Sequence, residues 1–171
     1  MTDWVRASNP MASISNEAEA LASARASAIA ILVGALYGVF SLVVGMDAVR
    51  AGVDAQMAAN PQPGMTSDLL VNIALGMGVF FILVQLVLGW VQWARPGVII
   101  PIIFAILVAW GLIQIPLSMQ AAASLGVDAP QAPIWTTAVA AAVLLVQLVL
   151  HIAGIRGARA LDRLRMEAAR A

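Results

Sequence analysis

The sequence predicts an all-α integral membrane protein: a bundle of four transmembrane helices with both termini on the cytoplasmic side. Composition, four long uncharged runs and the distribution of arginine support this fold class. Of the 171 residues, 62% are hydrophobic and only 11% are charged. Because soluble domains carry about 25% charged residues, this composition argues against a soluble globule.

Four uncharged runs are each long enough to cross a membrane. They lie between consecutive charged clusters, at 26–46, 69–94, 96–127 and 129–155. A helix needs about 20 residues to cross a hydrocarbon core of about 30 Å, and in lipid its backbone groups must be bonded within the segment. We therefore expect helical spans at approximately 26–46, 69–94, 97–124 and 133–155.

These spans divide the chain into three parts. Residues 1–27 form an N-terminal segment that holds acidic residues and lacks the apolar core of a cleaved signal peptide. Within it, Asn16 followed by Glu19 is typical of a helix start. Residues 28–156 form the transmembrane domain, and residues 157–171 form a basic cytoplasmic tail.

The placement of arginine predicts the orientation. All nine cations are arginine, and eight of them fall on one predicted side: Arg6, Arg25, Arg95, Arg156, Arg159, Arg163, Arg165 and Arg170. The other side holds Arg50 alone, among four aspartates. Positive residues favour the cytoplasmic side, and tryptophans such as Trp90 and Trp93 favour the membrane boundary. We expect a bacterial inner membrane, because arginine without lysine and abundant alanine are typical of GC-rich bacterial coding.

A repeated hexamer suggests an internal duplication. LVQLVL occurs at 83–88 and at 145–150, AILV at 30–33 and 105–108, and GVDA at 52–55 and 126–129. Three matches in the same order indicate two helical hairpins related by a pseudo-two-fold axis along the membrane normal. The alternative is coincidence within a restricted apolar alphabet.

A stripe of small residues in the first span predicts close helix packing. Its members recur at helical spacing: Ala30, Gly34, Gly38, Ser41 and Gly45. Small residues let two helix backbones approach closely in lipid. The stripe therefore predicts a helix–helix contact, within the bundle or between protomers.

Five polar residues within the spans form a candidate intramembrane site: Gln85, Gln92, Gln114, Gln147 and His151. Amides in lipid seek hydrogen-bond partners on other helices, so one interpretation is bonding across the bundle. The other is a polar lining for a ligand. His151 is either an ordinary hydrogen-bonded histidine or a haem or quinone ligand or proton carrier.

Missing residue types limit the function. The chain has no cysteine, no charged residue inside a span, and no phosphate-loop, metal-cluster or nucleophile–base motif. Net charge is zero, which argues against a nucleic-acid partner. We expect no enzyme activity, metal or cofactor. The prediction is a structural or accessory subunit in the lipid bilayer, assembling with itself or other membrane subunits; the alternatives are a small transporter or channel for a neutral or amphipathic solute, and a haem- or quinone-linked redox subunit.

Overall fold

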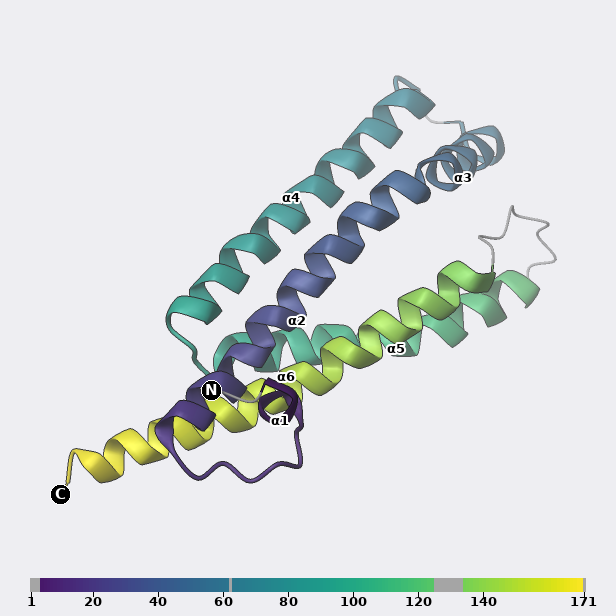
Figure 1. Ribbon diagram of the computed structural model, residues 1–171. Helices are drawn as coiled ribbons and strands as arrows, with labels where there is room; N and C mark the ends of the chain where they lie inside the picture. Colours follow the sequence, from purple (N-terminus) through teal and green to yellow (C-terminus); the bar gives the residue numbers. More distant parts are fainter. Residues whose placement is uncertain (1–3, 62, 125–133, 171) are drawn as a thin grey trace.

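The computed structural model describes residues 4–61, 63–124 and 134–170, and within these ranges it contains six helices and no strand. Four of the helices are long and apolar enough to cross a membrane, which confirms the all-helical class and the four candidate spans. The second GVDA copy, at 126–129, lies outside the described residues. In chain order the helices are α1 (Trp4–Ser8), α2 (Glu17–Val44), α3 (Met46–Ala59), α4 (Ser67–Ala94), α5 (Ile99–Ser124) and α6 (Ile134–Ala168) (Figure 1).

Side-chain caps fix the starts of two long helices. Asn16 Oδ1 accepts a hydrogen bond from the backbone N–H of Glu19, and the Glu19 carboxylate accepts one from the backbone N–H of Ser15. This reciprocal arrangement satisfies backbone donors that a helix start leaves unpaired. Thr66 Oγ1 accepts from the N–H of Leu69 at the start of α4. The helix start predicted at Asn16 is thus confirmed.

Helices α2 and α6 are longer than a membrane crossing requires. α6 has 35 residues, which is about 52 Å at 1.5 Å per residue, against a hydrocarbon core of about 30 Å. α2 already begins at Glu17, ahead of the expected boundary at 27/28. The expected boundaries at 27/28 and 156/157 each fall inside a continuous helix, so the polar segments next to the first and fourth spans are helical extensions of them.

A bend at Gly45 separates α2 from α3. The backbone N–H of Gly45 still bonds to the carbonyl of Ser41 at 2.8 Å, and the next turn starts immediately at Met46. Beyond the bend, Arg50 of α3 forms an ion pair with Asp68 at the start of α4. This pair closes the connection between the first two spans.

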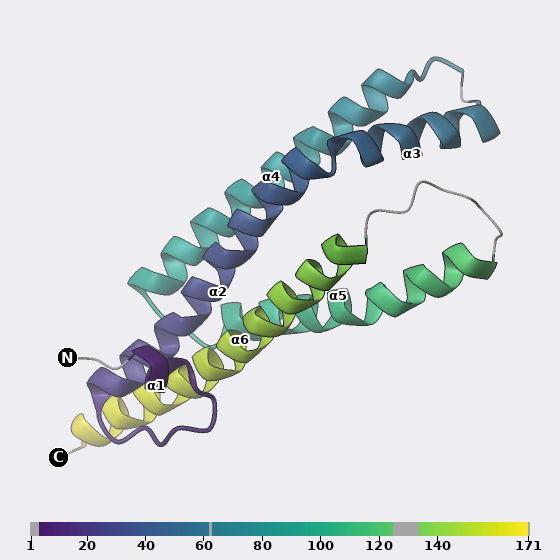
Figure 2. The same ribbon diagram turned by 45° about the vertical axis from the view of Figure 1, so that its right-hand side comes forward.

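The four long helices form an open row in the order α4, α2, α6, α5. α2 and α6 share the most extensive contact, α4 packs on the other side of α2, and α5 packs on α6. Among the described residues α4 and α5 hardly touch, and Figure 2 shows the α2–α4 and α5–α6 hairpins diverging away from the chain termini. The four helices therefore pack as an open row around the α2–α6 contact.

The row also lacks the symmetry that a duplication predicts. A pseudo-two-fold axis exchanging the hairpins would pair α2 with α5 and α4 with α6, so the α2–α6 contact would have an equal in an α5–α4 contact. In the described residues the first is the most extensive contact and the second is almost missing. The duplication stays a prediction from the sequence.

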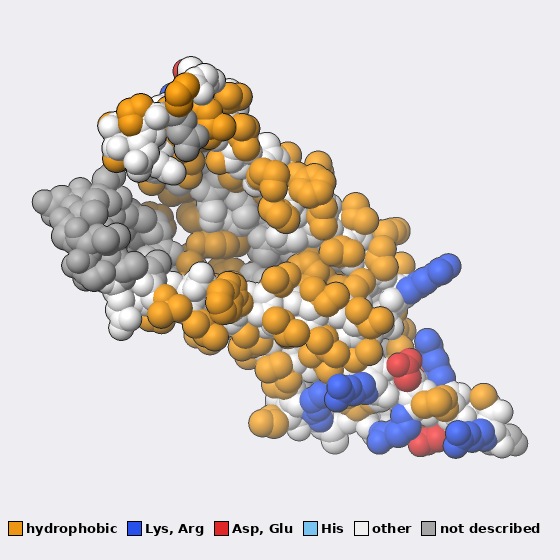
Figure 3. All heavy atoms as spheres, turned by 180° about the vertical axis from the view of Figure 1, so that it is seen from behind, with side chains coloured by type: hydrophobic (Ala, Val, Ile, Leu, Met, Phe, Trp, Pro, Cys, Tyr) orange, Lys and Arg blue, Asp and Glu red, His pale blue; other side chains and the backbone are white. Residues whose placement is uncertain are grey.

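Arginine gathers at one end of the molecule, which we call the arginine-rich end. α1, the start of α2 and the C-terminal part of α6 all lie there (Figures 1 and 3). In Figure 3 the blue arginine side chains cluster around this end, while the visible surface of the long helices is largely hydrophobic. The charged ends of the chain therefore share one end of the row, as the spans predicted.

Buried residues concentrate near this end. In α2 they run from Ala20 to Ala35, and in α6 from Gln147 to Leu161. We call these segments, together with the parts of α4 and α5 that lie beside them, the arginine-rich half. The parts of the long helices at the opposite end of the row form the far half. Large apolar side chains such as Phe80 and Trp110 are exposed in the far half, as expected for helices that face lipid.

Candidate intramembrane polar site

Glycines bring α2 and α6 into very close contact. A Cβ at Gly154 would lie 2.5 Å from Ser27 Cβ, and a Cβ at Gly157 would overlap the backbone nitrogen of Ala24. Because side-chain atoms do not approach so closely, only glycine allows the two backbones to meet here. Ser23 Oγ then donates a hydrogen bond to the carbonyl of Ala153 across the contact, at 3.0 Å.

This contact buries His151 where α2, α5 and α6 meet. Its Nδ1 lies 2.8 Å from Ser27 Oγ, and its ring stacks on Phe104 of α5 with centroids 5.6 Å apart. Its Nε2 is buried too, and no group in the described part of the chain bonds to it. The imidazole thus links three helices through one ring nitrogen and one ring face.

Gln92 connects α4 to α2 and to the turn that follows α4. Its Nε2 donates to the carbonyl of Ala24 at 3.3 Å and to that of Gly97 at 3.1 Å, and its Oε1 accepts from the N–H of Gly97 at 3.4 Å. The side chain is fully buried. Its carboxamide is therefore occupied by backbone groups, as a structural residue requires.

The two glutamines of the repeated hexamer meet at one glycine of α2. Gln85 approaches from α4 and Gln147 from α6, and each Oε1 lies 3.1 Å from the position that a Cβ would take on Gly34. Gln147 is buried and Gln85 is half-buried. The missing side chain of Gly34 is what leaves room for both amides between the helices.

Gln114 is separate from the other four polar residues. It lies on α5, where its side chain is exposed, and no hydrogen bond joins its carboxamide to another described side chain or backbone group. The predicted set therefore divides: Gln85, Gln92, Gln147 and His151 pack around α2, and Gln114 faces outward.

The predicted small-residue stripe has different roles along its length. Ala30 is fully buried, and Gly34 receives the two glutamines. A Cβ at Gly38 would lie 3.1 Å from the Ile82 side chain of α4, and one at Gly45 would press on the carbonyl of Ser41, which accepts the bond at the bend. The stripe thus serves packing between spans of the same chain as far as Gly38.

The closest contact was not among the residues predicted from the sequence. Ser23 and Ser27 precede the predicted stripe, and Gly154 and Gly157 lie at the end of the fourth span. The signal was present: Ser23 and Ser27 are four positions apart in a stretch rich in alanine and serine, and Gly154 and Gly157 are three positions apart. Such spacing on two helices is the pattern of close helix pairs in membranes.

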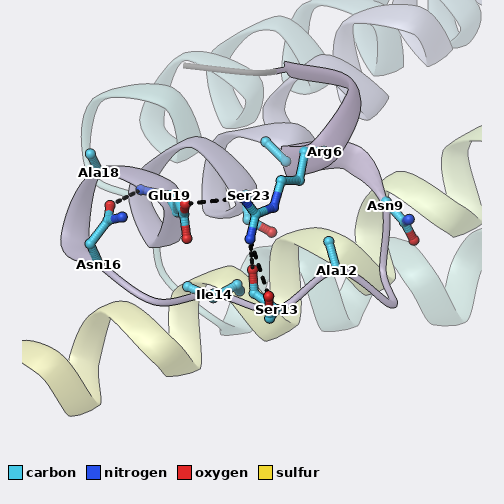
Figure 4. A pocket seen from close by; sticks show the side chains of 10 residues that line it. Arg6, Asn9, Ala12, Ser13, Ile14, Asn16, Ala18, Glu19 and Ser23 are labelled. Carbon is cyan, nitrogen blue, oxygen red and sulfur yellow. Dashed lines mark hydrogen bonds and ion pairs between the residues drawn. The ribbon is translucent and has the colours of Figure 1, made fainter. Parts of the chain in front are cut away.

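A second polar cluster lies outside the apolar spans, in a pocket of about 390 Å³ between α1, the segment after it and the start of α2 (Figure 4). Arg6 donates to Ser13 Oγ at 3.1 Å and lies 3.6 Å from a Glu19 oxygen. Arg156 of α6 donates to the carbonyl of Ala12. These bonds hold the N-terminal segment against α2 and α6.

Comparisons with protein-family models, with curated proteins and with solved structures found no match. The function must therefore be inferred from the geometry.

The buried polar groups of the arginine-rich half form hydrogen bonds mainly with backbone groups and with each other. Among the described residues there is no group of three side chains placed to hold a metal ion. Gln92 is fully used by backbone groups, and Ser23 and Ser27 bond across the α2–α6 contact. The chemistry available here is hydrogen bonding that fixes α4 and α6 against α2.

Proposed function

We propose that this chain is a non-catalytic subunit of the bacterial inner membrane that assembles with copies of itself or with a larger membrane complex. The proposal places both termini in the cytoplasm, because the arginine-rich end follows the bias of positive residues toward that side. Its basis is the contrast between a firmly packed arginine-rich half and a far half whose hairpins diverge.

The observation that carries the proposal is the exposure of Gln114 within an apolar span. Gln114 lies 15 residues after Ile99, the first residue of α5, or about 22 Å along the helix, so it falls within a hydrocarbon core of about 30 Å. An amide facing lipid lacks hydrogen-bond partners and is costly. A neighbouring chain that packs on this face of α5 would supply one.

The alternative functions have less support. A transport path would need the five polar residues to line one passage, yet Gln114 faces away from the others and Gln92 is bonded to backbone. A haem or quinone site would need space beside His151. Ser27 Oγ lies at hydrogen-bond distance from Nδ1, Phe104 stacks on the ring, and the remaining nitrogen Nε2 is buried.

The test uses an affinity-tagged chain expressed in its native membrane beside an untagged copy. After gentle extraction, the amount of untagged chain or of a stoichiometric second polypeptide recovered with the tag is measured. Replacing Gln114→Leu removes one interhelical hydrogen bond, worth about 0.6–2 kcal/mol in membranes. We expect the assembly to weaken by about 3- to 30-fold.

The matched control is Gln120→Leu, the same chemical change on an exposed residue of the same helix. Gln120 lies about 31 Å along α5, at the edge of the hydrocarbon core, where water satisfies its amide. Equal recovery from the two variants and the wild type would contradict the proposal.

A further inference from the structure

An apolar groove runs along α2 and α4 in the arginine-rich half. It has a volume of about 440 Å³, and its lining includes Ala28, Leu32, Gln85, Gly89, Trp90 and Trp93. Gly89 deepens it, because a Cβ there would meet only Ile31 and the carbonyl of Ala28 at ordinary contact distances. Since both helices are candidate spans, the groove opens toward the lipid.

Tryptophans mark where this groove meets the membrane boundary. Trp90 is 72% exposed and Trp93 is 38% exposed, and both lie in the last two turns of α4. Tryptophan prefers the headgroup level of a bilayer, where its ring is in an apolar region and its N–H reaches polar groups. This end of the groove therefore lies at headgroup depth, and the Gln85 end lies deeper.

Arg25 is fixed at the headgroup end. It lies one turn before Ala28 on α2, its Nε donates to the carbonyl of Trp93 at 3.2 Å, and its guanidinium carbon lies 5.0 Å from the centre of a Trp93 ring. A cation over an indole face is attracted by the ring. These contacts hold Arg25 in one place, and within the described residues no hydrogen bond or ion pair involves its two terminal nitrogens.

Arg25 differs in its partners from the four arginines that form ion pairs in the described part of the chain. Arg6, Arg50, Arg163 and Arg165 each form an ion pair with a carboxylate. In the described part of the chain no carboxylate pairs with Arg25, although its side chain is half-buried. The positive charge of this guanidinium, at headgroup depth, complements the headgroup of an anionic lipid. The apolar groove beside it suits the shape of an acyl chain.

We propose that the groove binds one anionic phospholipid, with its phosphate on Arg25 and the upper part of one acyl chain along Ala28, Leu32 and Gly89. The exposed Arg95, two residues beyond Trp93, adds a second positive charge at the same level. Basic sites between helices at the cytoplasmic boundary suit anionic headgroups, and a guanidinium suits phosphate oxygens. This site does not depend on the assembly proposed above.

In the experiment the full-length protein is purified in a mild detergent. It is then incubated with mixed micelles that contain equal amounts of phosphatidylglycerol and phosphatidylcholine with identical acyl chains. Native mass spectrometry then counts the lipids that stay bound. We expect phosphatidylglycerol to be retained in preference. Arg25→Gln should lower that preference about fivefold, the factor for one basic residue near an anionic surface.

Three further variants separate this site from general attraction and from misfolding. Arg159→Gln removes an exposed arginine of the tail and should leave the preference unchanged. Arg25→Lys keeps the charge and should retain more phosphatidylglycerol than Arg25→Gln. Gly89→Leu fills the groove and should reduce retention of both lipids.

Several results would overturn the proposal: an unchanged lipid ratio in Arg25→Gln, an equal loss in Arg159→Gln, full lipid retention in Gly89→Leu, or displacement of the lipid by inorganic phosphate alone. Because the readout is bound lipid per chain, it is separate from the recovery of associated chains that tests assembly.

Discussion

The two halves of the row differ in how their polar side chains are placed: they are buried and bonded in one half and exposed in the other. In the arginine-rich half, glycine and serine bring α2 and α6 so close that backbone meets backbone, and buried amides bond to carbonyls. In the far half, glutamine and tryptophan of α5 are exposed, and the hairpins diverge.

This difference indicates in which half the chain itself supplies the hydrogen-bond partners of its polar side chains. Lipid offers no hydrogen bonds, so polar groups inside spans are stabilised only by protein partners. The chain supplies those partners itself for Gln92 in the arginine-rich half, whereas no described residue supplies one for Gln114 in the far half. The first half is therefore a joint within the chain, and we propose that the second is a surface for another chain.

The largest effect should come from adding one methyl group at the joint. Gly157→Ala places a Cβ against the backbone of Ser23 and Ala24, and neither can move aside without separating α2 from α6. Overpacking of this kind costs about 1–3 kcal/mol. We expect that loss in the free energy of unfolding, measured by reversible denaturation of the purified protein in mixed micelles.

Two other glycines make this a graded comparison. At Gly34 the added methyl would meet the ends of two flexible glutamine side chains, so the loss should stay below about 1 kcal/mol. At Gly76, in the far half of α4, nothing lies within 4 Å, and alanine should be neutral or slightly stabilising. Equal losses at Gly157 and Gly76 would remove the distinction between the halves.

A smaller effect should separate Gln92, which is bonded to backbone, from Gln114, which is exposed. Gln92→Leu leaves the carbonyls of Ala24 and Gly97 without their side-chain donor, which costs about 1–2 kcal/mol. The same denaturation measurement should show this loss. Gln114→Leu should leave the unfolding free energy of the single chain almost unchanged, and a larger loss there than at Gln92 would reverse our assignment of their roles.

Much of the fold could be predicted from the sequence because lipid imposes simple rules. Uncharged runs of sufficient length must be helices, and Asn16 with Glu19 gave the start of α2. What hydropathy could not provide was the order of the helices. Which face of α2 meets α6 depends on residues such as Gly157 and Ser27, whose small size matters only when both helices are considered together.

The candidate site was predicted in its residues but only partly in their roles. Gln85, Gln147 and His151 do lie against α2, yet the sequence did not identify the partner of His151, which is Ser27 on α2. A hydroxyl 124 positions away in the sequence cannot be assigned by helical periodicity. The outward direction of Gln114 likewise depends on how α5 rotates against α6, which single-helix patterns leave open.

The most direct test of the far half as an assembly surface is the mass of the particle extracted gently from the protein's own membrane. One chain has a mass of 17.8 kDa. We expect native mass spectrometry to show either a multiple of this mass or one chain with a stoichiometric second polypeptide. A particle that contains a single 17.8 kDa chain and only lipid would contradict the proposal.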